Sequence, residues 1–540
     1  MYLEFDKDYF NNFVTKALGN QSRFVKSASN DWGNSTRSSY FNLLTDEEFE
    51  KLEDLANQKE EKNGYNRSLQ MQISKLKKIL DTESALVRSS NLRDFSTALF
   101  CYLTDEMIDG WMYRRIGKSD DYTPVLITRI RYVPSMKDDP AFVEMRYVYN
   151  GNSERVIQSS VTFHGSDISK RNVFEVLQAS NFYHESPEFK EKYNADKKRF
   201  DEAYKQKFKQ FLSTGSALAS YYSSSINLPN YVKIKKPVKV INEERSYIRS
   251  FDEIYENRFW EETDIHECFF NVPTQFFIKV FDLEKHDTNY VFVNDLELYK
   301  YDTKMSEKIV LPEHQKELID VLVNDFDVLK SDIVEGKSGG TSILCVGKPG
   351  LGKTLSAEIY SESSQRPLYK IHSGQLGLDS DSVEKQLRIC FERSERWNAV
   401  VLIDEADIFI RERGNDIAHN AVVASFLRTL EYFNGLLFMT SNRENDIDDA
   451  IISRCIAMIR YVQPDYESRV RIWTVLAESF KEDLNKELIE ELAKHFPDTS
   501  GRDIKELLKL TSRYVKAKGL EHSLENFRIC SQFKMVSYTE

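Results

Sequence analysis

The stretch GKPGLGKT, Gly347–Thr354, has residue types and spacing suited to gripping phosphate. It follows the apolar run SILCV and precedes the helix-like LSAEIYSES, the strand–loop–helix context in which such a loop cradles phosphates. Glycines let the backbone bend so that its N–H groups face phosphate oxygens at a helix N-terminus. The pattern predicts a nucleoside triphosphate site. Its expected lining residues are Gly347, Lys348, Pro349, Gly350, Leu351, Gly352, Lys353, Thr354 and Leu355.

Individual side chains at this loop and at a second motif have separate expected roles. Lys353 reaches the β- and γ-phosphates of ATP, and the Thr354 hydroxyl takes a Mg²⁺ position. The run VVLIDEAD places Asp404 and Glu405 at the end of an apolar strand, where ligands of parallel sheets bind. Asp404 is expected to hold Mg²⁺, directly or through water. Glu405 is expected to polarise the attacking water as a general base.

Two more polar residues complete the predicted hydrolytic site. GLLFMTSNR ends a third apolar strand at Asn442, whose amide could orient the hydrolytic water. In IDDAIISRCIAMIRY, Arg454 follows an acidic helix start. A single arginine is more often a surface charge. This one stands where a neighbouring subunit could insert it against a bound γ-phosphate, an arrangement that raises rates by about 10³–10⁵.

The letters DEAD also admit a DEAD-box helicase as an alternative. In those enzymes the P-loop and the DEAD motif lie farther apart than Lys353 and Asp404 do here. The strand after the acids ends in TSNR rather than in the SAT of those helicases. Both features disfavour the helicase.

The elements that must position these residues follow from the hydrophobic pattern. TSILCVG, VVLIDEAD and GLLFMTSNR each precede a helix-like segment, an alternation that builds a parallel sheet covered by helices. From about Asp465 the pattern is purely helical. The predicted fold is a P-loop α/β core over residues 301–464, with helices on both faces of the sheet, and a small helical lid over residues 465–540.

The N-terminal half is predicted to be α+β. Residues 1–115 are expected to be mostly helical, and SLQMQISKLKKIL carries apolar residues at helical spacing, which favours an amphipathic helix over a short coiled coil. Residues 116–300 are expected to form an α+β domain that recruits a target. There VLITRIRYV alternates as a strand, and two strands are predicted around an Asn150–Gly151 turn.

A long helix is predicted after these strands, with Ser186 as N-cap and Pro187 at its first position. Aromatic residues follow one face of it, interleaved with lysines, and could stack nucleic-acid bases; a buried face opposite a solvated face is the simpler interpretation. They are Phe189, Tyr193, Phe200, Tyr204 and Phe208. The serine-rich residues 213–230 are the best linker candidate.

A basic cluster in YVKIKKPVKV has two interpretations. It could contact phosphates, or it could be a charged edge strand carrying Pro237, which we favour because such edges discourage aggregation. The lysines concerned are Lys233, Lys235, Lys236 and Lys239.

Composition excludes several classes of protein. With 540 residues, 41% hydrophobic and 30% charged, the chain is typical of globular proteins, and its net charge of −12 argues weakly against wholesale nucleic-acid binding. Six cysteines lie far apart without a CxxC pair, which favours a reducing, cytoplasmic location over a disulfide framework. No apolar run approaches the roughly 20 residues that cross a bilayer, so no membrane partner is expected.

Residues from about Leu311 to Leu520 resemble an AAA ATPase module of the AAA+ superfamily. The matching motifs are Walker A (Gly347–Thr354), Walker B (Val400–Glu405), sensor 1 (Asn442), an arginine finger (Arg454) and a helical lid. The run QLGLDSDSVEKQLRICFERSERWNAVVLIDEADIFIRERG is similar to a sparsely characterised branch, in which a divergent N-terminal region precedes one module. The resemblance implies ATP hydrolysis with Mg²⁺ in a homo-oligomer, a hexamer, that remodels or disassembles a protein target held by residues 1–300.

Three departures from the family pattern qualify this resemblance. The stretch that aligns with the substrate-gripping pore loop has Leu376-Gly377 and no aromatic residue, which puts threading in question. SRCIA keeps Arg454 but has Ala457 where many relatives place a second arginine. In TSGRDIK, Arg502 could touch the γ-phosphate as sensor 2 or could be a surface charge. Two alternative functions therefore stay open: a nucleic-acid-dependent ATPase, and a nucleotide-gated scaffold with slow hydrolysis.

Overall fold

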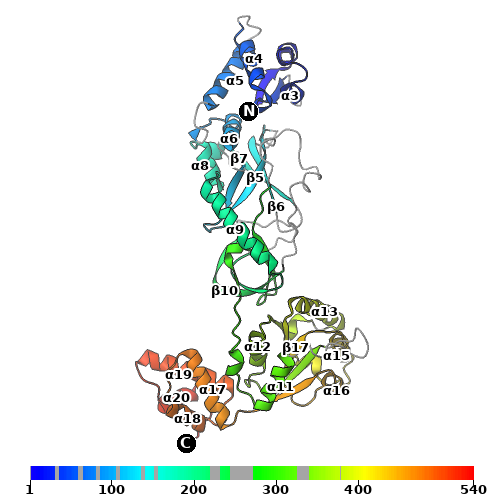
Figure 1. Cartoon of the computed structure of the whole chain (residues 1–540), viewed down its shortest axis with the longest axis vertical. Coiled ribbons are helices and arrows are strands. Elements are labelled where there is room, and N and C mark those ends of the chain that lie inside the picture. Colours follow the sequence, from blue (N-terminus) through cyan, green and yellow to red (C-terminus); the bar gives the residue numbers. More distant parts are fainter. Residues whose placement is uncertain are drawn as a thin grey trace. The chain divides into compact units, whose positions relative to one another are not determined.

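The computed structural model describes residues 2–30, 36–58, 65–80, 86–104, 110–135, 140–150, 156–218, 231–243, 272–324, 340–377 and 379–539. The chain divides into two compact units (Figure 1). The first comprises Met1–Lys207, Leu212–Asp282 and His286–Glu297, and the second comprises Phe208–Phe211, Leu283–Lys285 and Leu298–Glu540. The predicted Asn150–Gly151 turn lies at Gly151 outside the described residues, as does the part of the serine-rich segment from 219 to 230.

The first unit begins with a small helical cluster around a three-stranded antiparallel sheet, ordered β1-β3-β2. Its elements are β1 (Tyr2–Asp6), α1 (Lys7–Tyr9), η1 (Phe10–Val14), α2 (Thr15–Leu18), α3 (Arg23–Lys26), β2 (Ser29–Asn30), β3 (Thr36–Tyr40), η2 (Phe41–Leu43), α4 (Asp46–Ala56) and α5 (Tyr65–Leu80). Leu69, Ile73 and Leu76 of α5 are buried in its core, whereas Leu80 is 52% exposed. The amphipathic helix is confirmed, and its buried face ends before Leu80.

A second sheet in the same unit is antiparallel, ordered β7-β6-β5-β4-β8. Its strands and helices are α6 (Leu92–Thr104), β4 (Trp111–Arg115), β5 (Tyr122–Val133), β6 (Phe142–Asn150), β7 (Val156–His164), α7 (Gly165–Ile168), α8 (Val173–Ala179) and β8 (Phe182–Tyr183). The predicted strands of this region are confirmed. Helices α6 and α8 contribute to the core on one face of this sheet, with Leu99, Met145 and Val176 fully buried or nearly so.

Helix α9 (Pro187–Lys205) begins as its sequence predicts, because the Ser186 hydroxyl accepts the Phe189 N–H at 3.3 Å and Pro187 is the first helical residue. Its aromatic residues are packing residues. Phe189 stacks on Tyr113 with ring centroids 4.7 Å apart, and Phe200 is 3% exposed. The buried-face interpretation is confirmed for the helix. Phe208, the fifth aromatic of the pattern, lies beyond the helix with a φ of +61°.

A third sheet follows, ordered β10-β11-β12-β9-β13, and β10 also pairs with β9, so the strands close into a small barrel that appears as a ring in Figure 1. The strands are β9 (Gln210–Leu218), β10 (Val232–Asn242), β11 (Phe277–Asp282), β12 (Thr288–Phe292) and β13 (Leu296–Leu298), with η5 (Val293–Asp295) before β13.

The barrel corrects two interpretations of the sequence. The start of the serine-rich segment is strand β9 rather than a linker, because Ser213 and Ala217 are small enough to alternate into the interior, where they are at most 1% exposed. Strand β10 has neighbours on both sides, so the edge-strand interpretation is wrong. The Lys233 ammonium lies 3.0 Å from Asp295 Oδ1 and 3.1 Å from Asp121 Oδ2, so this lysine forms ion pairs within the fold.

The second unit contains the predicted α/β core. Its sheet has the order β15-β16-β17-β14-β18 and all its pairings are parallel. The strands are β14 (Thr341–Gly347), β15 (Leu368–His372), β16 (Val400–Asp404), β17 (Leu436–Ser441) and β18 (Ala457–Tyr461). The helices are η6 (Met305–Lys308), α11 (Glu313–Asn324), α12 (Lys353–Ser363), η7 (Ser373–Gln375), α13 (Ser380–Trp397), α14 (Asp407–Ile410), α15 (Ile417–Leu430) and α16 (Asp449–Ile452).

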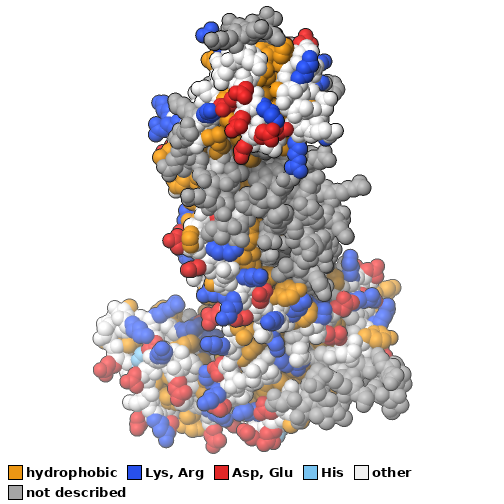
Figure 2. Space-filling model, turned by 45° about the horizontal axis from the view of Figure 1, so that its top comes forward, with side chains coloured by type: hydrophobic (Ala, Val, Ile, Leu, Met, Phe, Trp, Pro, Cys, Tyr) orange, Lys and Arg blue, Asp and Glu red, His pale blue; other side chains and the backbone are white. Residues whose placement is uncertain are grey.

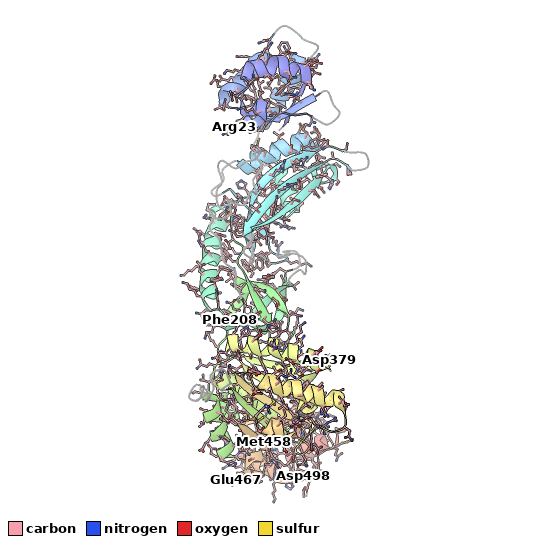
Figure 3. The ribbon with its side chains drawn as sticks, turned by 90° about the vertical axis from the view of Figure 1, so that its right-hand side faces the viewer. Arg23, Phe208, Asp379, Met458, Glu467 and Asp498 are labelled. Atoms are coloured by element: carbon pink, nitrogen blue, oxygen red, sulfur yellow. The ribbon has the colours of Figure 1, made fainter. Side chains whose placement is uncertain are left out.

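Helices cover both faces of this sheet. Helices α11 and α12 share a core with Ile343, Leu402 and Phe438, whereas α13 packs against β16 and α15. The fold-class prediction is confirmed. Figure 3 shows Asp379 at the start of α13 and Met458 on strand β18.

Four helices follow the core in sequence and form the lid (Figure 1). They pack around Trp473, Leu492, Leu507 and Phe527, each 0% exposed. Asp465 is the N-cap of the first, where the helical pattern was predicted to begin. The helices are α17 (Tyr466–Phe480), α18 (Lys486–His495), α19 (Gly501–Lys518) and α20 (Leu524–Gln532).

On the face shown in Figure 2, Lys and Arg side chains are interspersed with Asp and Glu side chains among the coloured residues. None of the helices in the described ranges combines the length and the apolar character that a membrane span requires.

Candidate nucleotide-binding site

The phosphate-loop candidate connects a buried strand to a helix. Strand β14 is buried along its length and ends at Gly347, and α12 begins at Lys353. Gly347, Gly350 and Gly352 have φ values of +145°, +87° and +100°, conformations that favour glycine. A Cβ on Gly347 would also lie 2.4 Å from the Tyr461 carbonyl oxygen. The glycines that the motif predicts are therefore required by backbone conformation, and at Gly347 by space as well.

Lys353 is folded back over this loop. Its ammonium donates to the carbonyl oxygens of Gly347 at 2.6 Å and Lys348 at 2.8 Å, and to Asn442 Oδ1 at 3.0 Å. Burial lowers the pKa of Lys353 below its ordinary value, against the opposing charge of Asp407. All three of these acceptors are neutral oxygens, so none of the hydrogen bonds neutralises the ammonium, and its charge can attract an anion in the loop.

Asp404, at the end of β16, is held by three donors. Its Oδ1 accepts hydrogen bonds from the hydroxyls of Thr354 at 2.8 Å and Thr440 at 2.7 Å, and its Oδ2 lies 2.8 Å from the Lys370 ammonium. Burial opposes ionisation of Asp404, but the Lys370 ammonium and the two threonine hydroxyls outweigh it and hold the pKa of this carboxyl below its usual value. Asp404 is therefore a carboxylate at neutral pH.

The pair Thr354 and Asp404 fits a Mg²⁺ ion. Both side chains offer oxygen ligands, and they lie within hydrogen-bond distance of each other at the phosphate loop. Mg²⁺ is usually held by one or two protein oxygens together with substrate phosphates and water. No group of three or more His, Cys, Asp or Glu side chains in the described residues could hold a metal ion by itself. The donor set suits a cation that is shared with phosphates.

Glu405 and Asn442 lie at the same edge of the sheet. Glu405 has a φ of +54°, and its N–H donates to Thr440 Oγ1 at 3.0 Å. A non-glycine residue in this conformation is uncommon and costs roughly 1–3 kcal/mol, and such strain clusters at functional sites. The Asn442 N–H lies 3.3 Å from Asp407 Oδ1, which also accepts the Ser441 hydroxyl at 2.6 Å.

A pocket of about 860 Å³ brings these groups together with the lid. Its polar end is lined by the residues from Pro349 to Leu355, by Asp404, Glu405 and Asn442, and by Arg502. The Arg502 N–H donates to the Gly350 carbonyl oxygen at 3.2 Å, so the start of α19 contacts the phosphate loop. The structure thus puts Arg502 in the pocket.

The other end of the pocket is largely apolar and suits a purine base. Core and lid both contribute to it, through Ile309, Leu311, Pro312, Leu476 and Phe480. The sequence analysis did not predict these residues, because no local pattern relates residues 309–312 to Leu476 and Phe480 in the lid. It also missed Lys370, Asp407 and Thr440, although Asp407 is the last letter of DEAD and Thr440 precedes the Ser-Asn pair of TSNR.

Arg454 is not among the residues lining the pocket. One guanidinium nitrogen donates to the Ala450 carbonyl oxygen at 3.1 Å, and another lies 3.8 Å from Glu431 Oε2. In the pore-loop region, Leu376 is 1% exposed, so it is packed in the core and does not face outward. A single chain therefore brings the predicted residues from Pro349 to Leu355, both acids, Asn442 and Arg502 to one pocket. Gly347, Lys348 and Arg454 do not line it, although the carbonyl oxygens of Gly347 and Lys348 accept hydrogen bonds from Lys353.

Comparisons with known proteins agree with this geometry. Residues 343–462 match the family described as ATPase family associated with various cellular activities (AAA). The chain is 29% identical over 221 residues to the ATP-dependent zinc metalloprotease FtsH of Chlamydia trachomatis, covering 37% of this chain and 23% of that protein. It is 26% identical over 235 residues to spastin of Dictyostelium discoideum, covering 41% of this chain and 35% of that protein.

A third relative is the proteasome-associated ATPase of Streptosporangium roseum, with 29% identity over 184 residues and 29% of each chain covered. All three matches span well under half of the relative's length, so the similarity concerns one module. This module has the phosphate loop, the acids at the end of β16 and the helical lid around one pocket. By its fold, its motifs and its relatives, this part of the chain is an AAA-family ATPase module.

Proposed function

We propose that this chain hydrolyses ATP between identical subunits, as a hexamer, and uses the energy to remodel or disassemble a protein target that residues 1–300 recruit. One observation carries the proposal. The groups suited to phosphate and Mg²⁺ meet in one pocket, whereas Arg454, the arginine expected to complete it, lies outside that pocket in the same chain.

The pocket residues divide the chemistry among themselves. Lys353 and the loop N–H groups bind the β- and γ-phosphates, and Arg502 reaches them from the lid. Mg²⁺, held by Thr354 and Asp404, would neutralise phosphate charge when bound. Glu405 accepts a proton from the attacking water, which Asn442 orients.

Self-association supplies the missing arginine in this proposal. Ile452 and Ile456 flank Arg454 and are 37% and 56% exposed, and Tyr432, beside its partner Glu431, is 61% exposed. Apolar side chains grouped around an arginine are typical of surfaces that a partner covers. A head-to-tail contact of this kind closes into a ring when the rotation between subunits allows it, and the family resemblance suggests six subunits.

A protein target is favoured over nucleic acid. The aromatic face of α9 packs in the core and Lys233 is ion-paired, so that face and this lysine of the basic cluster have structural roles. Two relatives are named for proteolysis or the proteasome. This chain has no HExxH motif, and Leu376 is buried, which favours remodelling without an aromatic grip in a pore. Cys345, Cys390, Cys455 and Cys530 are free thiols, in keeping with the proposed cytoplasmic location.

The decisive experiment mixes wild-type protein with the Arg454→Ala variant and measures ATP turnover. If each finger serves the neighbouring site, turnover falls more steeply than the wild-type fraction. The control variant Arg528→Ala removes an exposed arginine that is ion-paired with Glu525 in the lid. In mixtures with this variant, turnover should fall no more steeply than the wild-type fraction. Proportional loss with Arg454→Ala would contradict a finger acting between subunits. Lys353→Ala should abolish nucleotide binding, and tight ATP binding by this variant would refute the site itself.

A further inference from the structure

Lys370 occupies an unusual place in the core sheet. In the parallel register of β15 and β16 it lies opposite Leu402. Tyr369 and Ile371, on either side of it, are buried, and strand alternation puts Lys370 on the same face as Leu368. On that face Leu368 and Leu402 pack with α12, and Asp404 follows two residues after Leu402 at the end of β16. Packing alone does not account for a charged side chain at this position.

The Lys370 side chain ends at the predicted metal carboxylate. Its ammonium lies 2.8 Å from Asp404 Oδ2, while the hydroxyls of Thr354 and Thr440 occupy Oδ1. The side chains of Lys370 and Asp404 are 30% and 13% exposed, so solvent screens the pair less than it screens a surface ion pair. Lys370 is not among the pocket-lining residues, so it reaches Asp404 without entering the nucleotide pocket.

We propose that Lys370 is the resident counter-ion of Asp404, which compensates this carboxylate before Mg²⁺ is bound and competes with Mg²⁺ for it afterwards. Lys370 thereby sets the Mg²⁺ concentration that the nucleotide site requires. The inference rests on the proposed ATP site and adds how that site is regulated.

Removing the ammonium should have two opposite effects. Without it, Asp404 presents an uncompensated negative charge near the phosphates, so metal-free nucleotide binds more weakly. The same loss removes the repulsion that a divalent cation meets at Asp404, so Mg²⁺ acts at a lower concentration. A merely structural defect would weaken binding under both conditions, so the crossed response is specific to a counter-ion.

The test is an equilibrium titration of the full chain with a fluorescent ATP analogue, in EDTA and over a series of Mg²⁺ concentrations. Lys370→Met keeps the aliphatic stem and removes the charge. In this variant we expect the Kd for the analogue in EDTA to rise about tenfold and the half-effective Mg²⁺ concentration to fall about tenfold. A factor of about ten is the low end of the effect that one neighbouring charge has on the proton affinity of a carboxylate. Lys370→Arg keeps the charge and should stay near wild type. Lys385→Met, at an exposed lysine on α13, should match wild type.

The outcomes separate this inference from the proposed function. Unchanged Mg²⁺ dependence in Lys370→Met, or weaker binding both with and without Mg²⁺, would overturn the counter-ion role and leave the ATP site standing. Absence of nucleotide binding by the wild type at every Mg²⁺ concentration would instead overturn the proposed function. If Lys370→Met does not fold, Lys370→Gln provides a second neutral variant of similar length, judged by the same two shifts.

Discussion

Thr440 is the residue through which the site can be tested most directly. It is 2% exposed on β17, its hydroxyl donates to Asp404 Oδ1 at 2.7 Å, and the same oxygen accepts the Glu405 N–H at 3.0 Å. One hydroxyl thus fixes both the predicted metal ligand and the strained backbone of the predicted general base. Thr440→Val removes that hydroxyl with almost no change of shape.

The cost of this substitution follows from the two lost hydrogen bonds. A hydrogen bond to a charged group contributes about 1.5–3 kcal/mol, and a donor left without an acceptor costs about 1–3 kcal/mol. Because solvent reaches this edge of the sheet, we expect a combined loss of about 2–4 kcal/mol. A unit of this size loses roughly 2–4 °C of Tm per kcal/mol, so Tm should fall by about 5–15 °C.

Turnover should fall as well, because the Glu405 backbone, at a φ of +54°, loses its anchor. A displacement of about 1 Å at a catalytic group can cost roughly a hundredfold in rate, so we expect a ten- to hundredfold lower kcat with a smaller change in nucleotide affinity. The assays are thermal unfolding and steady-state ATP turnover. Thr440→Ser keeps the hydroxyl, loses one methyl group and should cost about 1 kcal/mol. Wild-type behaviour of Thr440→Val, or equal damage in both variants, would refute the assigned role of the hydroxyl.

Three further predictions address the base, the metal carboxylate and the barrel. Glu405→Gln should bind ATP but turn it over about 10²–10⁴-fold more slowly in a steady-state assay, and wild-type turnover would remove Glu405 as the base. Because the pKa of Asp404 is lowered on folding, its contribution to stability is present above its unfolded value of about 4 and is lost as the pH falls through the lower folded value. In Asp404→Asn the free energy of unfolding should therefore fall less steeply as the pH is lowered below about 4. An unchanged pH dependence would count against an ionised Asp404. A Cβ on Gly215 would lie 1.9 Å from the Tyr231 hydroxyl oxygen, so Gly215→Ala should destabilise the first unit by about 2–4 kcal/mol in chemical denaturation, whereas Gly165→Ala, with open space around it, should not.

Much of the candidate site could be predicted from short stretches of sequence. The phosphate loop needs glycines at set positions because its backbone adopts positive φ, and the apolar run before Asp404 marks a strand whose end lies at the sheet's ligand edge. Caps are equally local, as Ser186 and Asp465 illustrate at the starts of α9 and α17. These features depend on interactions between residues a few positions apart, so the local sequence is enough to predict them.

Contacts between distant segments were decided only by the tertiary structure. The pairing of Lys370 with Asp404 depends on β15 lying beside β16 in one register, and a strand pattern does not state its neighbour. Residues 213–218 are strand rather than linker because a closed barrel can bury their small side chains. The sequence by itself determined which groups could bind phosphate. The packing of the sheet and the lid determined that Arg502 joins them and that Arg454 does not, because side chains far apart in sequence meet only where burial of apolar surface brings their elements together.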